Sequence, residues 1–219
     1  MKVLALLSQK GGAGKTTLAV HLAVHAHLSG ERVALIDIDP QRSAGDWWRA
    51  REDKMPALAE CHPRHLVDAL NQAASRSIGV TILDTPPQAG PVAEMVAGLA
   101  GLSLIPCRPS PIDLRSTQRT VDIVKKVRAR AGIVLNACPL ARREGAEPSI
   151  TREAREGVAE FDIPVAPVII SHQAALSHPT MDGRTYIEVF RDGRAAYEIG
   201  ELWAWLVYMA RDADYRPSR

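Results

Sequence analysis

A glycine-rich stretch near the start of the chain, QKGGAGKTT at residues 9–17, constrains the fold more than any other feature. It lies between a short apolar run, residues 3–7, and a run with helical spacing, residues 15–28. A glycine-rich turn between a strand and a helix can point its backbone N–H groups at an anion, and the helix N-terminus adds its dipole. Lys15 would supply charge and Thr16 a hydroxyl for Mg²⁺. The stretch therefore predicts a phosphate-binding loop.

The loop departs from the general phosphate-loop pattern at one position. That pattern has glycine five positions before Gly14, where this chain has Gln9, and an additional lysine, Lys10, follows. The departure narrows the kinds of nucleotide-binding protein that the chain can resemble. The residues that we expect to contact the nucleotide from this loop are Gly11, Gly12, Ala13, Gly14, Lys15, Thr16 and Thr17.

Short apolar runs alternate with helical patterns along the rest of the chain. Strands are predicted at residues 3–7, 32–38, 79–83, 102–106, 133–136 and 165–170, with a weak strand or irregular segment at 55–62. Helices are predicted at residues 15–28, 41–51, 63–75, 92–100, 113–131, 150–160 and 195–211. Such alternation predicts an α/β fold: a mostly parallel twisted sheet with helices on both faces.

Acidic residues follow two of the predicted strands. Asp37 and Asp39 end one strand and Asp84 ends another. Because ligands bind at the carboxyl ends of parallel strands, we expect these residues and the loop to converge on one rim. Phosphoryl transfer needs charge neutralisation and a positioned nucleophile. Thr16, Asp39 and Asp84 would hold Mg²⁺ directly or through water, and Asp39 would orient the attacking water. Asp37 could equally be a turn residue.

Composition excludes several classes of protein. The formal net charge is +2 with 24% charged residues, which is too balanced to indicate a nucleic-acid or membrane partner by itself. The three cysteines, Cys61, Cys107 and Cys138, show no C-x-x-C spacing, so neither a disulfide framework nor a zinc site is expected. His21 and His25 share a helix face but lack a third metal ligand. With no long apolar run, we expect a cytoplasmic protein.

Three motifs together resemble one family. KGGAGKTT at residues 10–17, DIDPQ at 37–41 and DTPP at 84–87 are similar to the deviant phosphate loop, switch I and switch II of the ParA/MinD family of ATPases. DIDPQ and PSPID at 109–113 resemble the ParA branch, especially its short members. The resemblance covers essentially the whole chain. It implies a single P-loop ATPase domain over residues 1–219, without an N-terminal DNA-binding domain.

The resemblance also implies roles for individual residues. Lys10 matches the lysine that reaches across an ATP-dependent homodimer to the partner's phosphates, so the catalytic residues would be Lys10, Lys15 and Asp39. Asn136 matches the residue that recognises adenine, which suits an amide because it both donates and accepts hydrogen bonds. The cofactors implied are ATP and Mg²⁺.

ParA proteins bind DNA nonspecifically, which requires basic residues against phosphates. The resemblance places that surface near the last helix, at Arg184, Arg191 and Arg194, and Arg142 with Arg143 forms a second basic spot. The leading hypothesis is a nucleoid-associated ATPase that segregates a plasmid or chromosome when a ParB-type adaptor stimulates ATP hydrolysis.

Other functions remain open on sequence alone. The same chemistry could position a protein assembly, and a third alternative is a MinD-like regulator that cycles on and off a membrane. A metabolic phosphate-loop enzyme is a fourth. The apolar stripe of the last helix could form a membrane anchor, but it lacks lysine and carries Glu198 and Glu201, so we expect it to pack on the sheet and predict no stable membrane association. Trp47 and Trp48 could be core or adaptor-contact residues.

Overall fold

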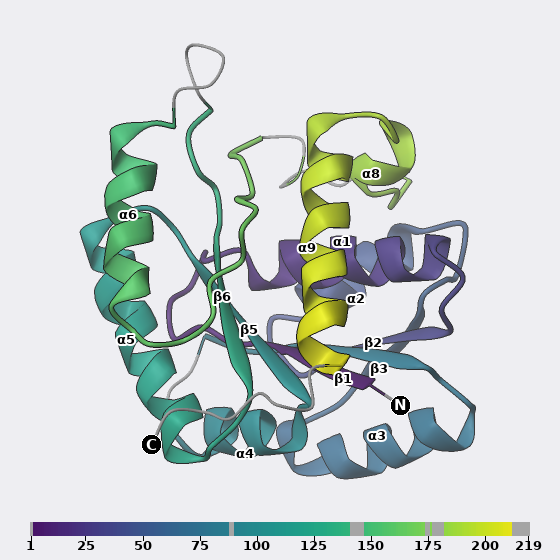
Figure 1. Ribbon diagram of the computed structural model, residues 1–219. Helices are drawn as coiled ribbons and strands as arrows, with labels where there is room; N and C mark the ends of the chain where they lie inside the picture. The colour runs from purple at the N-terminus through teal and green to yellow at the C-terminus, as the bar shows by residue number, and fades with distance from the viewer. Residues whose placement is uncertain (1, 88–89, 141–146, 174–175, 177–181, 212–219) are drawn as a thin grey trace.

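The structure is a computed structural model that describes residues 2–87, 90–140, 147–173, 176 and 182–211. Its centre is a sheet of six parallel strands (Figure 1). The strands are β1 (Lys2–Leu6), β2 (Val33–Asp37), β3 (Ala57–Glu60), β4 (Val80–Asp84), β5 (Leu102–Cys107) and β6 (Ala131–Leu135). Their order across the sheet is β3-β2-β4-β1-β5-β6. The predicted α/β class is confirmed.

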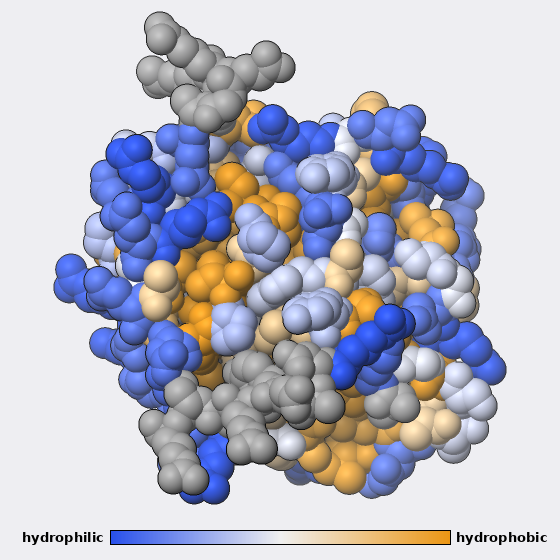
Figure 2. All heavy atoms as spheres, viewed as in Figure 1, coloured by the Kyte–Doolittle hydropathy of each residue, from blue (hydrophilic) through white to orange (hydrophobic). Residues whose placement is uncertain are grey.

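Helices cover both faces of this sheet. They are α1 (Lys15–Leu28), α2 (Ser43–Ala50), η1 (Pro63–His65), α3 (Leu66–Ser75), α4 (Pro91–Leu99), α5 (Pro111–Lys126), α6 (Ser149–Ala159), α8 (Tyr186–Val189) and α9 (Arg194–Arg211). One apolar cluster joins α1, α2, α8 and α9 to the sheet, and a second joins α3, α4, α5 and α6 to its other face. On the side of α9, hydrophilic residues predominate and apolar atoms gather between α6 and α9 (Figure 2).

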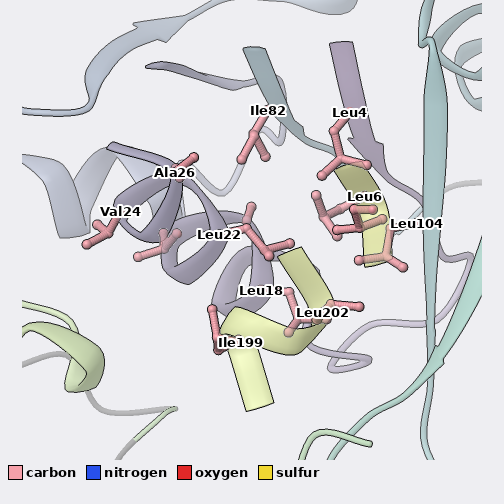
Figure 3. Packing of buried hydrophobic residues seen from close by; sticks show 14 of the residues in the cluster. Leu4, Leu6, Leu18, Leu22, Val24, Ala26, Ile82, Leu104, Ile199 and Leu202 are labelled. Carbon is pink, nitrogen blue, oxygen red and sulfur yellow. The ribbon is translucent and has the colours of Figure 1, made fainter. Parts of the chain in front are cut away.

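Alternation along the strands divides the core in two. Leu4 and Leu6 of β1 belong to the α1 side, whereas Ala5 lies on the other side, as expected for successive residues of a strand. Ile199 and Leu202 of α9 lie beside α1, as Figure 3 shows. The last helix packs beside α1 in the apolar cluster on one face of the sheet, in agreement with the prediction that its apolar stripe packs on the sheet. No helix of the described residues is long and apolar enough to cross a membrane.

One predicted strand is wrong. Residues 165–170 make only isolated bridges to the β6 side, Ile133 with Val165 and Cys138 with Ser171. Between the two bridges the chain advances five residues from Ile133 to Cys138 but six residues from Val165 to Ser171, so the register shifts by one residue. Pro167 also has no N–H group to donate. The segment runs along β6 but does not pair with it continuously.

One helix prediction needs correction, and one helix was missed. The helix expected at 113–131 is α5, which ends at Lys126, and Arg128 then adopts a left-handed backbone, φ 54°, before β6 begins. The short helix α8 was not predicted. Trp47 is 6% exposed and packs in the core, whereas Trp48 is half-buried and donates its indole N–H to the Pro56 carbonyl.

Candidate functional site

The predicted convergence at one rim of the sheet is confirmed by strand register. Asp84, the last residue of β4, pairs in register with Leu6 of β1 on one side and Asp37 of β2 on the other. The glycine-rich loop follows β1, and Asn136 follows β6. The connection from β1 leads to β2 in one half of the sheet, whereas the connection from β4 leads past β1 to β5 in the other half. The glycine-rich loop therefore lies at a point where the strand order reverses. This is the position where open α/β sheets bind ligands.

Glycine is required at two positions of the loop. Gly12 and Gly14 have φ values of 74° and 97°, a left-handed backbone that other residues adopt only with strain. A Cβ atom at Gly14 would also lie 2.2 Å from Nδ2 of Asn136. The Leu18 N–H then donates to the Gly14 carbonyl at 2.9 Å, which starts α1. The loop thus ends in a helix N-terminus whose first turn carries no acidic residue.

The loop forms one part of a cleft of about 220 Å³. Gly12, Gly14, Lys15, Thr16 and Thr17 line it, and the remaining lining residues come from the ends of α1 and α9 and from segments that follow β5 and β6. Those residues are Leu18, His21, Arg108, Asn136, Ala137 and Ile199, together with Ile170, Ser171, His172, Gln173 and Leu176 from the segment between α6 and α8. The cleft therefore offers phosphate-binding groups beside a mixed polar and apolar wall.

Asn136 is fixed directly to the phosphate loop. Its side-chain Nδ2 donates a hydrogen bond to the Ala13 carbonyl at 2.7 Å, and its backbone N–H donates to the Cys107 carbonyl at 2.8 Å. Asn136 is 7% exposed. The amide thus ties the strand β6 to the loop, and it also lines the cleft. The adenine-recognition role of Asn136 stays a prediction.

Lys15 and Asp84 carry strongly perturbed electrostatics. Burial lowers the pKa of Lys15, and the nearby Asp84 and Asp39 charges oppose this shift. Burial raises the pKa of Asp84 to about 7, an effect that Thr16 and Lys15 reduce. Although the Thr16 hydroxyl lies close enough to act on Asp84, neither carboxylate oxygen has a hydrogen-bond partner of good geometry among the described residues. A buried, unpartnered carboxylate beside a hydroxyl fits the oxygen ligands of Mg²⁺.

Asp37 and Asp39 have different surroundings. Asp37 is fully buried and accepts hydrogen bonds from the backbone N–H groups of Asp39, at 2.9 Å, and Gly45, at 3.1 Å. Burial raises the pKa of Asp37, and those two hydrogen bonds counteract the shift. Asp37 therefore shapes the loop before α2. Asp39 accepts a hydrogen bond from the Gln41 N–H. Because its side chain is only partly buried, Asp39 is accessible at the rim.

Lys10 forms an ion pair that the sequence did not reveal. Its Nζ lies 2.6 Å from Oδ2 of Asp113, whose side chain is 7% exposed. The Ser110 hydroxyl also donates to Asp113. In the sequence, the PSPID motif at residues 109–113 indicates only a resemblance to the ParA branch and gives no role for Asp113. The two residues are 103 positions apart, so only the fold brings them together.

The candidate DNA-binding arginines lie around α8 and the start of α9 (Figure 1). Arg184, Arg191 and Arg194 are all exposed, and Arg184 pairs with Asp182 at 2.7 Å. Arg142 and Arg143 lie outside the described residues.

The histidines of α1 form no metal site with other described residues. His21 is 4% exposed and its Nδ1 lies 2.8 Å from the Thr17 carbonyl. Burial lowers the pKa of His21 to about 4, so the ring is neutral and Nδ1–H is the donor. The three cysteines are free; Cys107 and Cys138 are buried and Cys61 is partly buried.

Sequence reasoning missed one part of the cleft. Arg108 and residues 170–173 line it but were not predicted as site residues. A signal was present, because residues 171–173 follow a segment predicted as a strand, and strand ends meet at the rim. The wrong strand prediction at 165–170 thus pointed to the correct edge of the sheet.

Several known proteins are similar to this chain in sequence or in fold. The chain is 39% identical over 124 residues to maintenance of carboxysome distribution protein A of Gloeobacter kilaueensis, a match covering 55% of each protein. It is 25% identical over 205 residues to the protein of the same name from Halothiobacillus neapolitanus, covering 91% of this chain and 93% of that one. A solved structure of apo McdA from Cyanothece superposes with a TM-score of 0.76 at 17% identity, covering 94% of this chain and 99% of that chain.

A protein-family model also matches most of the chain. The model described as the CobQ/CobB/MinD/ParA nucleotide binding domain matches residues 4–184. This range contains the phosphate loop, the three rim aspartates Asp37, Asp39 and Asp84, and Asn136. The chain therefore belongs to the CobQ/CobB/MinD/ParA family of nucleotide-binding domains.

Proposed function

We propose that this chain is an ATPase that binds Mg²⁺-ATP, dimerises on it, and positions a protein assembly inside the cell. The observation that carries the ATPase part is Asp84 at the end of β4, a buried carboxylate beside Lys15 and Thr16 of the glycine loop that has no well-formed hydrogen bond among the described residues. The protein-cargo part rests on the relatives named for carboxysome distribution, one of which aligns over 91% of this chain.

The residues of the loop divide the work on the phosphates. Backbone N–H groups of residues 11–17 and the start of α1 would bind the phosphate oxygens, and Lys15 would neutralise charge next to them. Thr16 and Asp84 would hold Mg²⁺, which supplies further charge neutralisation as phosphoryl transfer proceeds. Asp39, accessible at the rim, would orient the attacking water. An arriving cation would also favour the ionised form of Asp84, whose pKa burial raises to about 7.

Dimerisation would depend on Lys10. In this structure its ammonium group is held by Asp113 of the same chain, at 2.6 Å. To reach the phosphates of a partner subunit, Lys10 must leave Asp113. The exchange of one anion for another makes pairing of the subunits conditional on bound nucleotide. ATP binding and dimer formation then become one switch.

The exposed arginines would bind DNA without reading its sequence. Arg184, Arg191 and Arg194 are accessible around α8 and the start of α9. Nonspecific binding of this kind places the ATPase on the nucleoid and weakens steeply as salt rises. A partner protein that stimulates hydrolysis would release the chain from DNA.

Segregation of plasmid or chromosomal DNA with a ParB-type adaptor, the leading hypothesis from sequence, becomes the second candidate. The family includes ParA, but the relatives described above carry a name that refers to carboxysomes. The two candidates share the same chemistry and differ in cargo. In host cells that lack the gene, poor inheritance of a plasmid or chromosome would favour segregation. Normal DNA inheritance with a misplaced protein assembly would favour positioning.

The ATPase proposal is tested with two lysine variants. Lys15→Ala should abolish ATP binding, because Lys15 lies within the phosphate loop. Lys10→Ala should retain much of the binding to the monomer but lose the ATP-dependent dimer in sedimentation experiments. DNA retention is measured beside this with ATP, with ADP and without nucleotide, at several salt concentrations. Normal dimers of Lys10→Ala would refute the role of Lys10, and equal DNA binding in all three nucleotide states would refute the switch.

A further inference from the structure

A buried carboxylate on α9 holds one wall of the cleft. Glu198 accepts hydrogen bonds from the backbone N–H of Ser171, at 2.8 Å, and from its hydroxyl, at 2.5 Å. Glu198 is 6% exposed and Ser171 is 3% exposed. The ion pairs found among the described residues do not include Glu198. Because a buried carboxylate without a cation is costly, its hydrogen bonds to Ser171 are its main compensation.

Backbone geometry explains why Ser171 needs this acceptor. The preceding residue, Ile170, donates to the Leu135 carbonyl at 2.9 Å and accepts from the Cys138 N–H at 2.9 Å. Successive N–H groups of extended backbone point to opposite sides, so the Ser171 N–H points away from β6. No further strand lies on that side in the described sheet. Glu198 provides the acceptor that such a strand would provide.

The contact borders the cleft directly. Residues 170–173 line it, and so does Ile199, the neighbour of Glu198 on α9. Since residues 12–17 would take the phosphates, the other lining residues are left to contact the nucleoside. Ile199 also packs in the cluster that includes Leu18 of α1 (Figure 3). Core packing thus fixes the position of α9, and the hydrogen bonds from Ser171 to Glu198 hold residues 170–173 against this helix.

We propose that Glu198 is a positioning residue for nucleoside binding: its carboxylate fixes Ser171 and so the cleft wall formed by residues 170–173. This inference rests on the proposed nucleotide binding. Glu198 does not line the cleft and would not touch the nucleotide. Among the described residues, the phosphate loop forms no hydrogen bond or ion pair with Glu198 or Ser171, and its contacts run instead to Asn136, to α1 and, through Gln9 and Lys10, to α5. Loss of Glu198 should therefore weaken contacts to the base and sugar while phosphate binding remains.

The test compares a whole nucleotide with its phosphate part. Calorimetric titration with Mg²⁺ measures the affinity of the full chain for ATP and for inorganic tripolyphosphate. Glu198→Ala should lower the affinity for ATP about tenfold, because it leaves two buried donors unpaired, and should change tripolyphosphate affinity less than about twofold. Glu201→Ala is the matched control, since Glu201 lies on the same helix and is exposed. Glu198→Gln retains an acceptor and should restore part of the loss.

A variant with a smaller change protects the test against poor folding. Ser171→Ala removes only the hydroxyl bond and should lower ATP affinity selectively, by about threefold. Equal losses for ATP and tripolyphosphate, or unchanged ATP affinity in Glu198→Ala, would overturn the positioning role. If the unaltered chain bound neither ligand, the proposed nucleotide binding would itself be wrong. If the unaltered chain binds ATP but the variants lose no more affinity for ATP than for tripolyphosphate, only the role of Glu198 is refuted.

Discussion

The buried Asp84 should make the nucleotide-free protein less stable than a variant that lacks its charge. Its carboxyl is fully buried, and burial raises its pKa from 3.8 to about 7. Asn has nearly the same shape but cannot ionise. At about 1.4 kcal/mol per pKa unit, the shift corresponds to roughly 4 kcal/mol of stability, which the Asp84→Asn variant should gain where Asp84 is fully ionised.

The sign of this effect fixes its pH dependence. Because the folded-state pKa lies above the unfolded value, the folded state binds more protons, and ionisation of Asp84 favours unfolding. The unaltered protein should therefore lose stability as pH rises from about 4 to about 7, after which the difference from Asp84→Asn is constant. The gain of the variant should be about 2 kcal/mol near pH 5 and about 4 kcal/mol near pH 8.

Urea unfolding without nucleotide, in the presence of a chelator, measures this difference. Asp39→Asn is the control, since Asp39 lies at the same rim but is half-exposed. Addition of Mg²⁺-ATP should reverse the ranking, because a ligand that needs Asp84 stabilises only the unaltered protein. The argument would be refuted if, at pH 8, Asp84→Asn were as stable as the unaltered protein or less stable. Either result would mean that the buried charge of Asp84 does not destabilise the nucleotide-free protein.

Two further predictions concern buried contacts. Glu188→Ala should lower the free energy of unfolding by about 3–5 kcal/mol, because the Arg51 guanidinium, 2% exposed, would lose its bidentate partner. Glu60→Ala, which breaks an exposed pair, should have a much smaller effect in the same urea titration, and similar losses would contradict the argument. Gly14→Ala should cost about 2–5 kcal/mol and abolish ATP binding, because it combines left-handed backbone with a clash against a buried amide. Gly98→Ala, in helix α4 with open space around it and outside the site, should be tolerated, and a calorimetric titration that finds both variants equally able to bind ATP would exclude this reason.

Local patterns in the sequence were sufficient for most of the fold and for placing the glycine-rich loop and the aspartates at one rim of the sheet. Buried parallel strands appear as short apolar runs, and helices show a period of 3.6 residues, so their alternation predicts the α/β class. Glycine is needed where the backbone is left-handed, and this need is visible in the sequence at Gly12 and Gly14. The positions of Asp37 and Asp84 at strand ends were equally readable. All of these are properties of contiguous residues.

Local patterns failed where a segment depends on its neighbours. Residues 165–170 have strand-like composition, but the register shift and Pro167 prevent continuous pairing with β6. The same holds for Trp47, whose place in the core was undecidable from its spacing. Whether an apolar residue is buried, or a strand-like run is paired, depends on what lies beside it.

Sequence by itself determined that this chain carries a phosphate loop with two lysines on a parallel sheet. Only the tertiary structure decided which distant residues complete the site. Lys10 meets Asp113, Asn136 meets the Ala13 carbonyl, and Glu198 meets Ser171. The physical reason is that these contacts follow from the order of the strands and the docking of α9, which bring together residues whose separation along the chain carries no periodic signal. The backbone conformation of the loop therefore follows from its own glycines, whereas the residues that contact the loop are brought to it by the tertiary structure.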